Sequence, residues 1–211
     1  MSQYEKGAES KKNMLKAAKH LFYKDGYEAT TVRDIAKLSG LNLGSLKYYF
    51  GSKSDMALVI YLDFQKILMQ WVHTQGFDAN MQRLISETIE LQLCFESSSF
   101  ARFFIEIHNE PRIQDCLQEK MCSRFQGEEV GKVFMAVDLL ALKPALVRMY
   151  LSEEGKKIPK EEYLSFYIRR LLCLDGGEDE TLCRKVVSVL EGYYYNVVDN
   201  FTPVLVKINV D

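Results

Sequence analysis

Two short helical patterns, separated by Gly40, constrain the fold of this chain more than any other feature of its sequence. The first begins at Thr31, which can act as an N-cap, and Asp34 follows three residues later, as in a capping box with Asp in place of Glu. The second begins at Asn42, another N-cap residue, and ends at a glycine. Two short helices joined by a tight glycine turn, behind a longer helix, predict a helix-turn-helix over residues 31–50.

Each short helix is predicted to have one apolar face that packs inward. The inward residues are Val32, Ile35 and Ala36 in the first helix and Leu46, Tyr49 and Phe50 in the second. The opposite face of the second helix carries small and polar residues, and a helix that enters the major groove of DNA needs such a free outer face. Asn and Ser can bond base edges or phosphates, and glycine lets the backbone approach the duplex. A three-helix packing module would have the same spacing, so the spacing alone leaves that alternative open.

Basic and acidic residues are unevenly distributed along the chain. Residues 1–55 hold ten Lys or Arg against six Asp or Glu, a net charge of +4, whereas the remaining residues hold 17 against 23, a net charge of −6. The overall net charge of −2 argues nothing by itself. A basic N-terminal part on an acidic body nevertheless suits a polyanionic partner at the N-terminus.

The rest of the chain also has the apolar periodicity of helices, so the fold is predicted to be all-α. Helices are predicted at about Ser10–Lys24, Met56–Val72, Asn80–Phe95, Phe100–His108, Ile113–Phe125, Lys132–Leu151, Lys160–Leu174 and Glu178–Asn200. Pro144 is expected to kink its helix or to start a new segment. The tail, residues 201–211, is apolar and strand-like, and its place in the fold is left open.

Length and composition limit the remaining possibilities. The chain has 211 residues, of which 47% are hydrophobic, and its 12 Gly and 4 Pro argue against long linkers. There is no apolar stretch of membrane-spanning length, and the polar N-terminus lacks the apolar region of a secretion signal. A cytoplasmic protein without a membrane partner is therefore expected. The five cysteines match no disulfide framework or zinc motif, and we interpret them as buried small residues, with a redox sensor as the alternative.

The segment from Lys11 to Tyr61 resembles the TetR family of regulators, most specifically in AAKHLFYKDGYEATTVRDIA and GSLKYYFGSK. The resemblance implies an all-α homodimer whose recognition helices contact the two half-sites of a palindromic operator in double-stranded DNA. It also implies a C-terminal domain that binds a small-molecule effector and shifts the DNA-binding heads. By motif, the DNA contacts of the family fall on Thr31, Arg33, Gly44, Ser45, Tyr48, Tyr49 and Lys53.

Two positions depart from the family pattern. An aromatic residue commonly follows the position of Leu46, but here the residue is Lys47, which favours a phosphate contact over stacking. Leu43 stands where polar or basic residues are frequent, and it either touches a thymine methyl group or packs on the fold. Together with Asn42, these two residues complete the set of candidate DNA-binding residues.

Two domains follow from this assignment: residues 8–55 for DNA binding, and residues 56–211 for ligand binding and dimerisation. The dimer interface of the family usually comes from the last two long helices, which places it here on Tyr163, Phe166, Tyr167, Leu171, Val186, Val189, Leu190, Tyr193, Tyr194 and Val197. A thick core within one subunit is the alternative for these residues. The ligand pocket is expected among the middle helices, with the candidate lining residues Trp71, Phe95, Phe103, Phe104, His108, Met121, Phe125, Met135 and Tyr150. Ordinary core packing is the alternative for each of them, and as a set they predict an apolar or aromatic effector with few polar anchors.

The predicted function is therefore a ligand-responsive transcriptional regulator, and repression is the usual behaviour of the family. A helical adaptor that binds a protein partner through its N-terminal module is the alternative. An enzyme is not expected, because the sequence contains no Rossmann glycine fingerprint and no HExxH or GxSxG motif. No cofactor and no metal site are predicted.

Overall fold

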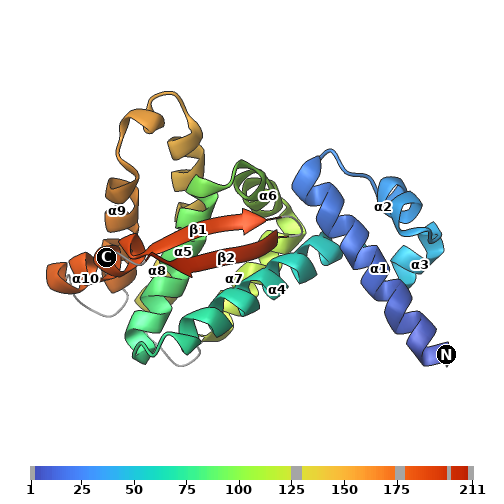
Figure 1. Cartoon of the computed structure of the whole chain (residues 1–211), viewed down its shortest axis with the longest axis horizontal. Coiled ribbons are helices and arrows are strands. Elements are labelled where there is room, and N and C mark those ends of the chain that lie inside the picture. The colour runs from blue at the N-terminus through green and yellow to red at the C-terminus, as the bar shows by residue number, and fades with distance from the viewer. Residues whose placement is uncertain (1–2, 125–129, 174–178, 199–200, 209–211) are drawn as a thin grey trace.

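The computed structural model describes residues 3–124, 130–173, 179–198 and 201–208, and most of these residues are helical. The helices are α1 (Gln3–Lys24), α2 (Val32–Ser39), α3 (Leu43–Phe50), α4 (Lys53–Thr74), α5 (Ala79–Glu96), α6 (Ser98–His108), α7 (Pro111–Arg124), α8 (Val130–Leu151), α9 (Lys160–Cys173) and α10 (Glu180–Glu191), with a short 3-10 turn at Gly155–Lys157. Two strands follow, β1 (Tyr193–Val198) and β2 (Thr202–Lys207). Figure 1 shows a small N-terminal head, formed by α1, α2 and α3, that α4 connects to a larger body. The predicted helical fold is confirmed, with one small sheet added.

The head contains the predicted helix-turn-helix. Its capping box is present, because Thr31 Oγ1 accepts the N–H of Asp34 at 3.2 Å while the Asp34 carboxylate accepts the N–H of Thr31 at 3.0 Å. Gly40 ends α2 with a φ of 69°, in the left-handed region that glycine enters at little cost. The apolar faces of α2 and α3 meet α1 in one core cluster, in which Ile35 and Leu46 are buried.

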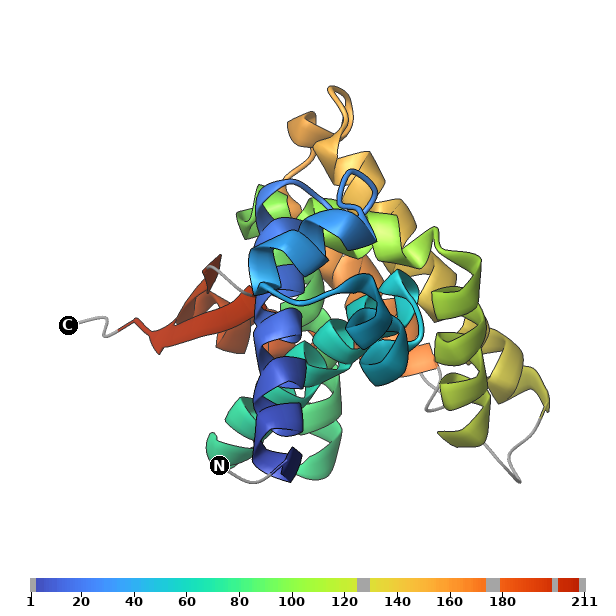
Figure 2. The same ribbon diagram turned by 90° about the vertical axis from the view of Figure 1, so that its right-hand side faces the viewer.

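α4 is one continuous helix that begins at Lys53, after the N-cap Ser52, and ends at Thr74. It has buried residues along its whole length, and Phe64 packs against Phe100 of α6 with ring centroids 4.5 Å apart. The predicted domain boundary between residues 55 and 56 lies inside this helix, so that boundary stays a prediction. In Figure 2 the body extends to both sides of the head, with the β-hairpin on one side and α7 and α8 on the other.

α5 is the central helix of the body, and α4, α6, α8, α9 and β1 all contact it. Every residue from Thr88 to Cys94 is buried, because this helix is covered on all sides. α8 continues through Pro144, so no new helix begins there. Among the helices within the described ranges, none is both long and apolar enough to cross a lipid bilayer.

The prediction of a single helix over Glu178–Asn200 is wrong in its second half. α10 ends at Glu191, and the chain then forms an antiparallel hairpin in which Tyr194 of β1 lies opposite Val206 of β2. The β1 segment, YYYNVV, consists mainly of aromatic and β-branched residues, which fit a strand better than a helix. Its pairing partner is β2, within the tail whose place the sequence leaves open.

One end of the hairpin contacts both the body and the head. Phe201 has a φ of 55°, and its buried ring packs on that of Phe103 of α6 with centroids 4.2 Å apart. Tyr23 of α1 donates its hydroxyl hydrogen to the carbonyl oxygen of Val197 at 2.9 Å. Figure 1 shows the two strands lying across α5, which β1 contacts.

Candidate DNA-binding surface and cavity

α3 has the two faces that the sequence predicts. Leu46 and Phe50 are buried in the head, whereas Leu43, Lys47 and Tyr48 are exposed on the other side of the helix. Tyr48 is 83% exposed, so its ring adds little to stability through burial. This outer face is therefore free to contact a partner.

Asn42 and Ser45 are bonded to each other at the start of α3. The side-chain oxygen of Asn42 accepts the N–H of Ser45 at 2.9 Å and the hydroxyl hydrogen of Ser45 at 3.2 Å. The N-cap predicted at Asn42 is thereby confirmed. The amide NH₂ of Asn42 takes no part in this cap, so its hydrogens are left for a base edge or a phosphate.

Two other candidate DNA contacts hold the head together. The hydroxyl group of Thr31 donates to Asp34 at 2.6 Å. The Lys53 ammonium donates to the carbonyl oxygens of Tyr27 and Thr30, each at 2.9 Å, and lies 4.2 Å from the centre of the Tyr27 ring. Burial lowers the pKa of Lys53 despite the nearby carboxylates. Because two of its three ammonium hydrogens fix the turn after α1, a phosphate contact of Lys53 depends on the third.

Arg33, Gly44 and Tyr49 complete the candidate surface. Arg33 is exposed in the first turn of α2, and Gly44 is exposed in the first turn of α3. Tyr49 is half-buried, and its ring lies 5.1 Å from that of Tyr48. The candidate residues thus gather at the N-termini of α2 and α4 and along α3, and contact with DNA stays a prediction for each of them.

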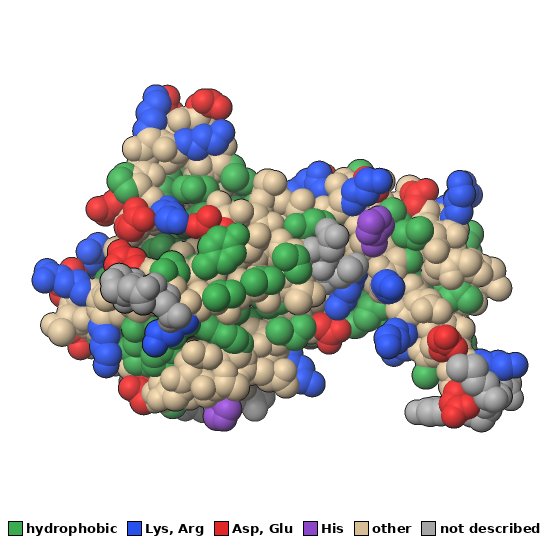
Figure 3. Space-filling view, viewed as in Figure 1, with side chains coloured by type: hydrophobic (Ala, Val, Ile, Leu, Met, Phe, Trp, Pro, Cys, Tyr) green, Lys and Arg blue, Asp and Glu red, His purple; other side chains and the backbone are tan. Residues whose placement is uncertain are grey.

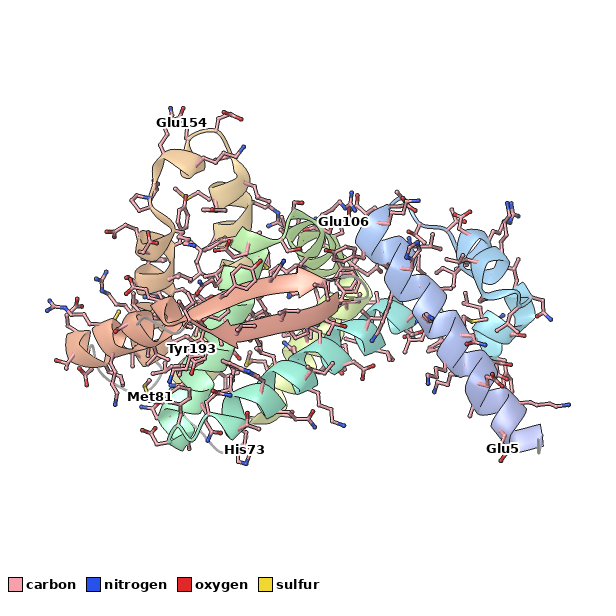
Figure 4. All side chains as sticks on the ribbon, in the orientation of Figure 1. Glu5, His73, Met81, Glu106, Glu154 and Tyr193 are labelled. Atoms are coloured by element: carbon pink, nitrogen blue, oxygen red, sulfur yellow. The ribbon has the colours of Figure 1, made fainter. Side chains whose placement is uncertain are left out.

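The junction between the head and the body is made by α6. The Glu106 carboxylate accepts two backbone N–H groups just after α1, those of Tyr27 and Glu28, and Figure 4 shows Glu106 at this junction. Arg102 donates to two carbonyl oxygens in the last turns of α1 at 3.0 and 2.7 Å, and Glu110 accepts the hydroxyl hydrogen of Tyr27 at 3.1 Å. One side of α6 therefore positions the head.

Replacing Glu106 with alanine is expected to loosen this junction while both domains stay folded. The substitution removes the acceptor of two backbone N–H groups, and a hydrogen bond to a charged group contributes roughly 1.5–3 kcal/mol. Amide hydrogen exchange at Tyr27 and Glu28 should accelerate, whereas the amides of the buried α5 should exchange as in the wild type. Unchanged exchange at both positions would contradict this role for Glu106.

A cavity of about 560 Å³ lies in the body among α4, α5, α6, α7, α8 and α9. Its apolar walls include Leu68, Met69, Leu117, Met121, Leu139, Leu140 and Leu171. Its polar lining includes Tyr61, Gln65, Glu87, Glu90, His108, Lys143 and Tyr167. The volume lies within the range of about 300–1,000 Å³ that is usual for small-molecule sites.

A buried ion cluster forms part of the polar lining. The Lys143 ammonium bonds the carboxylates of Glu87, at 2.6 Å, and of Glu90, whose side chain is only 3% exposed. Burial disfavours the charged form of Lys143, but the two carboxylates outweigh it and hold the pKa of the ammonium well above its usual range. Burial, together with the Glu90 carboxylate, raises the pKa of the Tyr61 phenol. Lys143 therefore stays charged and Tyr61 neutral at physiological pH.

His108 is a neutral, buried histidine in the cavity wall. Burial lowers its pKa to about 4, and its Nδ1 lies 2.7 Å from the carbonyl oxygen of Phe104. Because a carbonyl oxygen only accepts, Nδ1 carries the hydrogen and Nε2 is the acceptor of the ring. Within the described ranges, no residue donates a hydrogen bond to Nε2.

The candidate ligand-binding residues divide between the cavity and other parts of the fold. His108 and Met121 line the cavity. The remaining described side chains pack elsewhere, Trp71 against Tyr193, Phe95 against Tyr150, Phe103 against Phe201 and Phe104 behind His108. Phe125 and the side chain of Met135 lie outside the described residues. Sequence reasoning missed the ion cluster and both tyrosines of the cavity, and the one available signal was a charge at Glu90 within the apolar run of α5.

The residues predicted to form the dimer interface also divide into two groups. Those buried within one protomer are Tyr163, Tyr167, Leu171, Val186, Leu190 and Val197. Phe166 and Tyr194 remain 46% and 53% exposed, and Val189 and Tyr193 are half-buried. Figure 3 shows hydrophobic side chains gathered over the hairpin. The prediction that residues 193–198 belong to an interface helix is wrong, because these residues form strand β1. Dimerisation itself stays a prediction.

The structure thus consists of a helix-turn-helix head joined to a helical body that contains a cavity. Residues 14–60 match the sequence model of the bacterial regulatory proteins, tetR family. The match identifies these residues as an N-terminal domain of the tetR type.

Similar curated proteins match this chain in the same N-terminal region. The HTH-type transcriptional regulator QacR of Staphylococcus aureus is 39% identical over 66 residues, which cover 31% of this chain and 35% of QacR. The dual regulator CecR of Shigella flexneri is 45% identical over 53 residues, 25% of this chain and 23% of CecR. TtgR of Pseudomonas putida is 35% identical over 52 residues, 25% of each chain. The matched segments span about a third or less of the length of these relatives.

Solved structures match over most of the chain. RolR in complex with its ligand resorcinol has a TM-score of 0.57 and 17% sequence identity, over 88% of this chain and 96% of RolR. The structure of a putative TetR-family transcriptional regulator from Rhodococcus sp. has a TM-score of 0.52 and 19% identity, over 79% of this chain and 98% of that protein. At this level of identity the likeness shows a shared fold of head and body.

Proposed function

We propose that this protein is a transcriptional regulator, and not an enzyme, that binds a palindromic operator as a homodimer and acts in the cytoplasm. The observation that carries the proposal is α3, which buries Leu46 and Phe50 in the head and exposes Lys47 and Tyr48. This helix lies within the segment that matches the tetR family. In a dimer, two such helices would read two half-sites of DNA.

The cavity supports control of this DNA binding by a small molecule. It lies against α6, whose His108 borders the cavity while Glu106 holds the backbone after α1. A ligand that moves α6 would therefore act on both sites, because the same helix contacts them. The structural neighbour RolR binds resorcinol, a small aromatic compound, and we propose an effector of that size that releases the operator.

A salt series on operator DNA tests the proposed DNA binding. Contacts between lysine or arginine and phosphate release counterions, so affinity should fall steeply as salt increases. The promoter beside the gene of this protein is the first duplex to test, and a scrambled duplex is its control. Salt-independent binding, or no binding together with capture of a protein partner, would support the adaptor alternative.

A further inference from the structure

The polar end of the cavity offers acceptors for hydrogen bonds. His108 is 5% exposed, and its Nε2 accepts no hydrogen bond from the described residues while the side chain borders the cavity. The carboxylates of Glu87 and Glu90 also border the cavity. A ligand that places a donor here would give this ring nitrogen a hydrogen-bond partner.

The one buried ammonium group of this lining is already engaged. Lys143 bonds the carboxylates of Glu87 and Glu90, and its Nζ lies 5.6 Å from the centre of the Tyr167 ring. These two carboxylates engage two of the three ammonium hydrogens. A carboxylate ligand at this end would lie beside the negative charges of Glu87 and Glu90.

The walls around this polar end suit a ring. His108 packs against the rings of Phe104 and Tyr61, with centroids 4.1 and 5.3 Å from its own. Leucine side chains and Met121 also line the cavity, and methionine sulfur packs favourably on aromatic rings. The cavity thus combines an apolar space with one acceptor-rich end.

We propose that the effector is an uncharged aromatic compound of the phenol class, whose hydroxyl group donates to His108 Nε2. The inference rests on the proposed function only in calling the ligand an effector, because binding of the ligand can be measured without DNA. It extends that function by naming the polar group of the ligand.

Three probes that differ only at the polar end test this inference by isothermal titration calorimetry on the full chain. They are 4-butylphenol, its methyl ether 4-butylanisole, and 4-butylbenzoate, each at pH 7.5. The phenol is expected to bind at least about tenfold more tightly than the ether, since the ether cannot donate and one hydrogen bond to a buried acceptor is of that size. The benzoate is expected to bind more weakly than the phenol, because its carboxylate would lie beside those of Glu87 and Glu90. Equal affinity for phenol and ether, preference for the benzoate, or binding of none of the three would overturn the proposal.

Variants at His108 connect the preference to this nitrogen. His108→Phe keeps an aromatic ring but removes the acceptor, so the phenol and the ether should bind alike. His108→Gln restores an acceptor and should recover part of the preference, which also covers the case in which the phenylalanine variant does not fold. The matched control is His20→Phe, because His20 is exposed on α1 in the head. A phenol preference that survives in folded His108→Phe would contradict the assignment.

DNA binding of the same preparations separates the two claims. Operator binding without phenol binding refutes the ligand class alone. Phenol binding without operator binding supports the ligand class and refutes the proposed regulator.

Discussion

Replacing Lys143 with methionine is expected to lower the free energy of unfolding by about 3–5 kcal/mol. The substitution leaves the carboxylate of Glu90, 3% exposed, without the ammonium that bonds it. An uncompensated buried charge is costly because the protein interior solvates it poorly. Urea denaturation followed by circular dichroism measures the change.

Two further variants make this prediction specific to the ion cluster. Lys66→Met removes an exposed lysine from α4 and should change stability by no more than about 0.5 kcal/mol. Adding Glu90→Gln to Lys143→Met should recover part of the loss, because the second substitution removes the unpaired charge. A loss below about 1 kcal/mol in Lys143→Met would mean that the cluster contributes little to stability.

Replacing both Lys47 and Tyr48 with alanine is expected to weaken operator binding on the order of 100-fold or more. Each contact with phosphate contributes roughly 1 kcal/mol, and a homodimer repeats both contacts in its two half-sites. Both side chains are exposed, Tyr48 by 83%, so thermal stability should not change. Fluorescence anisotropy with labelled operator measures the affinity.

The control for this double variant is Lys66→Ala, which removes an exposed lysine from α4, outside the candidate DNA-binding surface. It should bind the operator within about twofold of the wild type, because a single exposed charge outside the interface is largely screened by salt. An unaffected double variant would show that DNA binding, if present, uses another surface.

The local structure of the head could be predicted from the sequence because its signals are local. The Thr31–Asp34 capping box, the Asn42 cap and the glycine at position 40 all act within a few residues. The hairpin could not be predicted in the same way. β1 follows α10 almost directly, and its residues become a strand because β2 pairs with them and Phe201 packs on α6. Both contacts depend on the tertiary fold.

The cavity was predicted in its general position but not in its chemistry. Aromatic residues of the middle helices were the natural candidates, yet most of them fill the core, as Phe103 does. The polar lining comes from residues on different helices, such as Glu90 of α5 and Lys143 of α8, which are 53 residues apart. A single sequence does not show that such charges meet. Lys53 is a similar case, because the backbone of the turn before α2 receives its hydrogen bonds.

Selection of bound duplexes from a random-sequence pool tests the DNA-binding account most directly. The full wild-type chain is expected to enrich an inverted repeat, because two recognition helices of a symmetric dimer read two related half-sites. The variant with alanine at positions 47 and 48 is expected to enrich no sequence. An absence of enrichment with the wild type, or the same enriched repeat with both proteins, would contradict the role assigned to α3.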